Sequence, residues 1–263
     1  MLDYLLSYAR PLSITLTLAL ASIPLGFVLA VLVTLWRRVP NFWIALPARA
    51  FVYFFRGTPL FVQLYLIWFG GRSLFNPRGL AGLEAAEASP LWILLYGGLN
   101  DLFDQHLLVG ILALALNTTA YTAEILHGAL DAVPLSNLEA ARAYGFSRRS
   151  RFLRILFPLA LRQAWPAYSN EVIFLTHATA LVYAVLSAPL GFGDLFRHSR
   201  NLGESDYNLL LHIPVAMAIY LLLSLSIFVL LAAIERRWHP PTATRPALTQ
   251  SRWRWLWPGS LLR

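Results

Sequence analysis

Three polar side chains interrupt an apolar stretch near the middle of the sequence, and they recur at the spacing of a helix. Asn117, Tyr121 and Glu124 occupy positions i, i+4 and i+7, which lie on one helical face. Asn117 stands ten residues after Leu107, so a helix would carry it about 15 Å into a hydrocarbon core of about 30 Å. Polar groups at such a depth usually face a cavity, which makes the three side chains candidate ligand contacts. As alternatives, Asn117 could bond to a neighbouring helix, and Glu124 could be solvated or contact another subunit.

A second apolar stretch contains a carboxylate. Glu171 follows Asn170 directly, and His177 shares a helical face with Asn170. A carboxylate in a low-dielectric interior needs a cationic partner to remain ionised, and a bound guanidinium, ammonium or imidazolium would supply one. Glu171 is therefore the candidate anion for a cationic ligand, with Asn170 and His177 as further contacts. The alternatives are an ion pair of Glu171 with an arginine such as Arg162 or a contact with a companion subunit, helix–helix bonding for Asn170, and plain packing for His177.

The composition places these residues in a membrane protein. Of the 263 residues, 58% are hydrophobic and 13% are charged, against about 45–50% and about 25% in soluble domains. The sequence has no cysteine, which excludes disulfides, thiolate catalysis and cysteine-ligated metals. All 21 cationic side chains are arginines, and the formal net charge is +8. A P-loop needs a lysine, so any ATP that drives this chain must bind to a partner subunit.

The hydropathy pattern predicts an all-α membrane protein with a single transmembrane domain over residues 1–238. A spanning helix needs about 20 apolar residues, and five segments meet that length. The expected spans are roughly 12–35, 50–71, 107–127, 167–189 and 209–234. The second span contains Arg56-Gly57-Thr58-Pro59, where we expect a kink or a helix restart. Thr58 suits the N-cap of the restarted helix, and Pro59 suits its first position.

The arginines predict the orientation of the chain. Three segments, 37–56, 142–162 and 236–263, contain 16 of the 21 arginines. Because cytosolic loops carry the excess of arginine, we expect these segments in the cytosol, the N-terminus outside and the C-terminus inside. Residues 239–263 form a cytosolic tail rich in arginine and tryptophan, which is either an interfacial tether or disordered.

A basic segment between the third and fourth spans, about residues 134–162, has its own pattern. It contains Glu139-Ala140-Ala141 followed by Gly145, and glycine permits a sharp turn. We expect two short helices with a tight elbow, the second running from about Ser147 to Leu156 and ending before Pro158. Small alanines beside an acid suit insertion into a groove on another protein. The alternative is a basic amphipathic loop held by anionic lipid headgroups.

This spacing of Glu-Ala-Ala, glycine and proline resembles the EAA loop of ABC importer permeases. In that family the loop is a coupling helix that docks into each ATP-binding subunit. The resemblance implies a fold like that of type I ABC importers. The residues it assigns to ATPase coupling are Glu139, Ala140, Ala141, Gly145, Arg148 and Arg149.

Further segments resemble permeases for polar amino acids, and most closely those for histidine and for lysine, arginine and ornithine. They are 55–64, 117–125, 166–173 and 177–181, and the family signature in the first of them is Arg56, Gly57, Thr58 and Pro59. Many family members with uncharged substrates have glutamine in place of Glu171 and Lys-Asp in place of His177-Ala178. Both departures imply a basic amino acid as substrate.

The resemblance implies a permease subunit of the bacterial inner membrane that imports amino acids by alternating access. Its expected partners are two ABC ATPase subunits, a second permease that is identical or similar, an extracytoplasmic amino-acid-binding protein and membrane lipid, and no nucleic acid. It implies no cofactor for this chain, because ATP and magnesium would be used by the ATPase. One rival is an ion-coupled secondary transporter. An enzyme is disfavoured because the histidines show no paired metal-ligand spacing and no Gly-x-Ser-x-Gly motif occurs.

Overall fold

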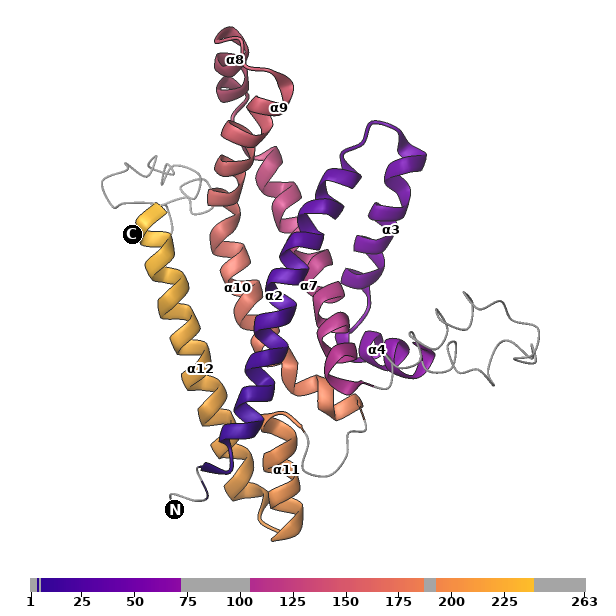
Figure 1. Ribbon diagram of the computed structural model, residues 1–263, viewed down its shortest axis with the longest axis vertical. Helices are drawn as coiled ribbons and strands as arrows, with labels where there is room; N and C mark the ends of the chain where they lie inside the picture. Colours follow the sequence, from indigo (N-terminus) through magenta and orange to yellow (C-terminus); the bar gives the residue numbers. More distant parts are fainter. Residues whose placement is uncertain (1–3, 5, 72–104, 187–192, 239–263) are drawn as a thin grey trace, which may run out of the picture.

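The chain folds into helices, as the hydropathy pattern predicts. The computed structural model describes residue 4 and residues 6–71, 105–186 and 193–238, and no strand occurs in these ranges. Figure 1 shows the arrangement of the elements. They are α2 (Ala9–Arg37), α3 (Phe42–Gly57), α4 (Leu60–Tyr65), the π-helical turn η1 (Leu66–Gly70), α7 (His106–Asp131), α8 (Leu135–Ala143), α9 (Arg148–Arg151), the π-helical turn η2 (Phe152–Leu156), α10 (Phe157–Val185), α11 (Leu195–Ser205) and α12 (Leu209–Trp238). The C-terminal tail and most of the stretch 72–106 lie outside the described residues.

Within the described ranges, three helices are long and apolar enough to cross a membrane: α2, α7 and α12. Helix α10 has 29 residues, which at 1.5 Å per residue is also long enough to cross. The predicted span 50–71 differs most from the structure. There α3 and the α4–η1 segment qualify only together, as a pair bent by 113°.

The bend between α3 and α4 follows from Thr58 and Pro59. A residue before proline is pushed out of the helical region, and Thr58 is extended, with φ −115° and ψ 143°. Helix α4 begins at Leu60, so Pro59 holds the cap position rather than the first helical position. The expected N-cap role of Thr58 is wrong, because its hydroxyl donates to the carbonyl of Phe54 at 2.9 Å.

Other helices begin where polar side chains satisfy their free amides. Asn41 accepts from the amide of Trp43 at the start of α3, and Ser147 accepts from Ser150 at the start of α9. Asp194 accepts from the amide of Arg197 at the start of α11. Such caps favour the local helix starts by about 1 kcal/mol each.

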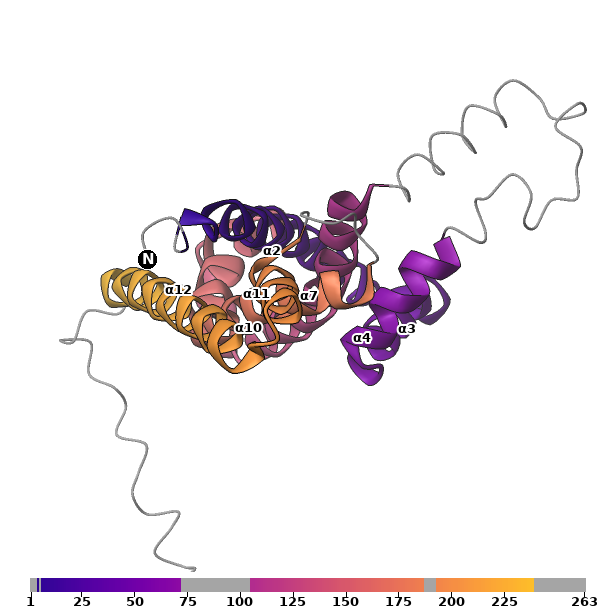
Figure 2. The same ribbon diagram turned by 90° about the horizontal axis from the view of Figure 1, so that it is seen from below.

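Helices α2, α7 and α10 form the centre of the molecule through small residues. Seen from below in Figure 2, α12 lies on one side of this centre and the α3–α4 pair on the other. A Cβ atom added to Gly26 of α2 would lie 2.1 Å from the Cγ2 of Thr118, and one added to Gly110 of α7 would lie 2.6 Å from Val182. Small residues let helix backbones approach closely in a membrane, where dispersion and interhelical hydrogen bonds hold them. The two glycines therefore set the spacing of α2, α7 and α10.

The two ends of the molecule differ. The α2–α3 turn and the α8–α9 loop lie toward one end, and α12 runs toward that end (Figure 1). The N-terminus and α11 lie at the opposite end. We call these the loop end and the α11 end.

A chain of hydrogen bonds ties the N-terminal segment to α11 and α12. Nε2 of His212 lies 2.7 Å from the carboxylate of Asp206, and its Nδ1 lies 2.7 Å from the hydroxyl of Tyr4. Tyr4 contacts the hydroxyl of Tyr8 at 3.1 Å, and Tyr8 contacts Ser199 at 3.0 Å. The chain fixes the start of α2 against the α11 end, and the sequence spacing gave no sign of it because its members come from three distant segments.

The neighbouring His198 makes this contact sensitive to pH. Its Nε2 lies 3.1 Å from the hydroxyl of Ser7, and its ring meets the ring of Tyr8 edge-on, with centroids 4.8 Å apart. Burial lowers the pKa of His198, and the charge of a protonated His212 lowers it further. The unfolded chain then takes up the proton more readily, so this contribution to stability is complete above a pH of about 6.5 and is lost as the pH falls through that value toward the lower folded pKa.

We expect the Tm of the purified protein to fall between pH 7.5 and pH 5.5, and to fall less in His198→Gln, which cannot titrate. Differential scanning fluorimetry at the two pH values measures both differences. An equal fall in the variant and the native protein would show that His198 does not contribute.

Candidate functional site

Glu171 lies in α10 with only 8% of its surface exposed, and it faces α7. The hydroxyl of Thr118 is hydrogen-bonded to its carboxylate. Its Oε1 has no partner among the described residues, and neither has the buried hydroxyl of Thr122, one turn along α7 from Thr118. Buried polar atoms are nearly always satisfied, so these two atoms are candidates for contact with a polar ligand.

Glu171 forms no ion pair with a cationic side chain, Arg162 included, in the described part of the chain. The alternative of a structural Glu171–Arg162 pair is therefore not found. An ionised carboxylate in such a place favours an external cation strongly.

Asn117 connects α7 to the bend between α3 and α4. Its Nδ2 donates to Oε1 of Gln63 at 2.8 Å, and both side chains are 2% exposed. Nε2 of Gln63 lies 2.7 Å from the carbonyl of Phe55 and 2.8 Å from that of Thr58. This is the helix–helix bond given above as the alternative for Asn117, although its Oδ1 remains without a partner.

Gln63 was not among the residues predicted to form the functional site. The available signal was a lone amide side chain in an apolar run within the segment 55–64. Gln63 binds the carbonyls that the bend leaves free at the end of α3, which explains how a 113° break is tolerated in an apolar environment.

Asn170 and His177 lie on a different face of α10 from Glu171. Both are exposed in this chain, and Nε2 of His177 contacts the hydroxyl of Ser224 in α12 at 2.5 Å. The structure therefore brings Thr118 to Glu171, with Thr122 one turn further along α7, and it places Asn170 and His177 on another face of α10.

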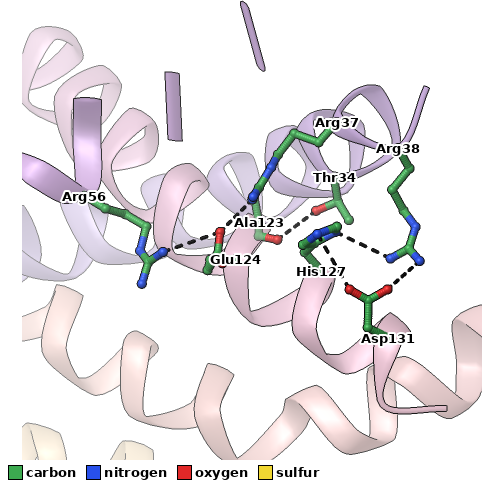
Figure 3. A network of polar contacts seen from close by, with 8 residues as sticks. All are labelled: Thr34, Arg37, Arg38, Arg56, Ala123, Glu124, His127 and Asp131. Atoms are coloured by element: carbon green, nitrogen blue, oxygen red, sulfur yellow. Dashed lines mark hydrogen bonds and ion pairs between the residues drawn. The ribbon is translucent and has the colours of Figure 1, made fainter. Parts of the chain in front are cut away.

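Tyr121 and Glu124 belong to a separate cluster, nearer the loop end. Glu124 is 2.7 Å from Nη1 of Arg37 and 3.4 Å from Nη1 of Arg56. The guanidinium of Arg56 also lies 5.8 Å from the ring centre of Tyr121, a cation–π distance. Glu124 is thus paired with arginines of its own chain (Figure 3). This differs from both alternatives given above, which were solvation and contact with another subunit.

The EAA segment forms the expected elbow at the loop end. Helix α8 ends at Ala143, and Gly145 adopts φ +76°, which residues with a Cβ rarely adopt. The amide of Phe146 donates to the carbonyl of Ala141 at 3.1 Å and closes the turn. Ala141 is buried, whereas the remaining candidate coupling residues are exposed: Glu139, Ala140, Gly145, Arg148 and Arg149.

The second part of this segment differs from the prediction that its helix ends before Pro158. Helix α9 continues through η2 directly into α10, where Pro158 lies in the first turn. The wider π-helical turn just before it accommodates the proline, which has no amide hydrogen to donate. A hollow of about 580 Å³ lies between α8 and the α9–η2 segment and is lined by Leu138, Arg142, Arg148, Arg149, Arg151, Phe152 and Leu156.

Comparison with known proteins gives one consistent result. Residues 13–240 match the family described as "Binding-protein-dependent transport system inner membrane component". The chain is 39% identical to the histidine/lysine/arginine/ornithine transport system permease protein HisM of Salmonella typhimurium, over 86% of this chain and 87% of that protein. It is 36% identical to HisM of Escherichia coli, over 90% and 96% of the two chains.

Another relative and two solved structures agree. The nopaline transport system permease protein NocM of Agrobacterium fabrum is 41% identical over 65% of this chain and 64% of its own. The crystal structure of an amino acid ABC transporter with histidines matches with a TM-score of 0.71 and 27% identity, covering 90% of this chain and 96% of that one. The MetNI methionine ABC transporter matches with a TM-score of 0.63 at 22% identity, over 89% and 97%, which supports the fold alone.

The Gln63–Asn117 pair allows a direct test of the bend. We expect Gln63→Leu to lower the free energy of unfolding by about 1–3 kcal/mol, because it leaves two carbonyls and the amide of Asn117 unpaired. In the double variant Gln63→Leu/Asn117→Leu, the loss of unfolding free energy should be smaller than the sum of the two single losses. Each single variant already removes the Gln63–Asn117 hydrogen bond, so the sum counts that bond twice.

Thermal or denaturant unfolding of the purified chain measures these losses. Gln163→Leu, at an exposed position of α10, is the matched control and should change little. Strictly additive losses for Gln63 and Asn117 would show that the two side chains do not support each other.

Proposed function

This chain belongs to the family of inner membrane components of binding-protein-dependent transport systems, and from that premise we propose that it carries basic amino acids. It is an ABC importer permease with an all-α fold of the type I importer class. The proposed substrates are arginine, lysine, ornithine and histidine. The names of the HisM relatives support this choice, because they give the same four amino acids.

The observation that carries the proposal is the unpaired carboxylate of Glu171. The side chains of these four amino acids can all carry a positive charge. A buried carboxylate that forms no ion pair with the described residues binds such a group favourably. The hydroxyls of Thr118 and Thr122 lie on the α7 face opposite and are available to the polar part of the ligand. Asn117 would act by holding α4 against α7, while Asn170 and His177 would contact the substrate or the companion permease from their exposed face.

The proposed mechanism is alternating access driven by separate subunits. The exposed residues of the α8–α9 elbow would dock into one of two ABC ATPases, with Glu139 at the contact, and the elbow of the second permease would dock into the other. The loop end would then be cytosolic, as the arginine bias indicates, and the α11 end would receive the loaded binding protein. A second permease, identical or similar, would complete the pathway. ATP hydrolysis would take place on the partner, since this chain has no lysine for a P-loop.

The substrate assignment predicts the effect of Glu171→Gln in the reconstituted complex. Uptake of arginine at limiting concentration should fall about 10- to 100-fold, the effect of losing a charge-assisted contact, and discrimination against glutamine should weaken. Basal ATPase activity should be unchanged, because Glu171 lies far along α10 from the elbow.

The control is Glu235→Gln, which removes a carboxylate of α12 that lies away from Glu171, the elbow and α11. Radiolabelled uptake into proteoliposomes, with and without ATP, measures both variants. Unchanged selectivity for arginine in Glu171→Gln would remove this residue from the site, and uptake by the chain alone in an ion gradient without ATP would favour the secondary transporter.

The elbow predicts a different phenotype for Gly145. Gly145→Val should lower the amount of amino acid moved per ATP, because a β-branched residue is strained at φ +76° by about 1–2 kcal/mol. Gly145→Asn should stay close to the native ratio, since asparagine tolerates positive φ. In the described part of this chain, no atom lies within 4 Å of the added Cβ, so a clash within the chain does not explain a defect. Equal ratios in the valine and asparagine variants would contradict the role of the turn.

A further inference from the structure

A set of charged residues joins three helices near the loop end. We call it the α2–α7 ion-pair network, and Figure 3 shows its members. They are Arg37 and Arg38 at the end of α2, Arg56 at the end of α3, and Glu124, His127 and Asp131 in the last two turns of α7. The network is separate from the substrate site proposed near Glu171 and from the elbow. Only Glu124 was also a candidate for substrate binding.

The network has two halves. In the first, the carboxylate of Glu124 lies between the guanidinium groups of Arg37, at 2.7 Å, and Arg56, at 3.4 Å. In the second, Asp131 lies 2.6 Å from Arg38 and 3.7 Å from the ring of His127. The Arg37 side chain is only 14% exposed, so its pair with Glu124 is less screened by solvent than a surface pair.

The position of the network relative to the elbow suggests its role. Asp131 is the last residue of α7, and α8 begins four residues later at Leu135. Between them, Val133 is buried in one apolar cluster with Ala30 of α2 and Val52 of α3. A displacement of α8 therefore reaches the end of α7 at once, and the network lies where that displacement can pass to α2 and α3.

The apolar contacts at this junction are not directional. They combine small residues such as Ala30 and Ala123 with larger ones such as Leu126. A carboxylate held by two guanidinium groups from two helices is directional, and polar groups buried among apolar ones can select one arrangement. The hydroxyl of Thr34 adds a contact of 3.2 Å to the carbonyl of Ala123.

We propose that the α2–α7 ion-pair network is a permanent strap that makes α2 and α3 move together with α7 when the ATPases displace the α8–α9 elbow. Glu124 is its central positioning residue and does not touch the substrate. The proposal uses the membership of the chain in the importer family and does not depend on which amino acid is carried. It also assigns a role to Arg56 of the family signature: Arg56 fastens the end of α3 to α7.

The opposite role would be a lock, a set of ion pairs that must open in each transport cycle. Covalent bridging of the network distinguishes a strap from a lock. Because the chain has no cysteine, the double variant Arg38→Cys/Asp131→Cys can be bridged selectively by a short bifunctional methanethiosulfonate reagent. Both positions are accessible, with side chains 33% and 54% exposed. A strap keeps working when it is made covalent, whereas a lock stops the cycle.

The experiment uses the whole complex in proteoliposomes and measures amino acid moved per ATP hydrolysed. Glu124→Gln should lower this ratio roughly fivefold or more and leave the basal ATPase activity unchanged. In the triple variant Glu124→Gln/Arg38→Cys/Asp131→Cys, bridging the two cysteines should bring the ratio back toward the native value. The control Arg236→Gln removes an exposed arginine in the last turn of α12, outside the network, and should not alter the ratio. Single-cysteine variants control for the reagent.

Two results would overturn the strap: an unchanged ratio in Glu124→Gln, or arrest of uptake when Arg38→Cys/Asp131→Cys is bridged. The ratio is measured with whichever amino acid stimulates the ATPase of the native complex. A complex that moves no basic amino acid would therefore refute the proposed substrate while the strap is still tested.

Discussion

The function of this molecule depends on one feature, a buried carboxylate that forms no ion pair with the described residues. Glu171 lies between α10 and α7 at 8% exposure, and its Oε1 has no partner among the described residues. Removing a charge from water costs several kcal/mol unless a counterion is present. Small residues bring α2, α7 and α10 close together, and Glu171 is buried in this packing, so the packing that holds the helices also favours a cationic ligand.

The two carboxylates of the predicted site show how environment divides similar residues between roles. Glu124 is held by Arg37 and Arg56, so its charge is satisfied within the chain and it is suited to joining helices. Glu171 has only a hydroxyl neighbour and is suited to binding. A transporter needs both, because a site that binds the cargo is useful only if the helices around it move together.

The sequence predicted the helical class, the interrupted second span, the elbow at Gly145 and the low-dielectric surroundings of Glu171, because each rests on local spacing or composition. It did not predict contacts between segments. Helical periodicity placed Asn117 and Glu124 on one face, but only the structure shows that one meets Gln63 and the other meets arginines. The hydrogen-bonded chain at His212 escaped for the same reason, since its partners lie far apart in the sequence. The interruption at Thr58 and Pro59 was expected, but its angle of 113° was not.

A cryo-EM reconstruction of the assembled transporter with arginine bound would test the central claim most directly. The quantity of interest is the distance between the guanidinium group of the ligand and the carboxylate of Glu171. We predict a direct ion pair, with nitrogen and oxygen about 2.7–2.9 Å apart, on the side of α10 that faces Thr118. Arginine bound elsewhere in the pathway, with the Glu171 carboxylate still unpaired or paired to a residue of another subunit, would contradict the account.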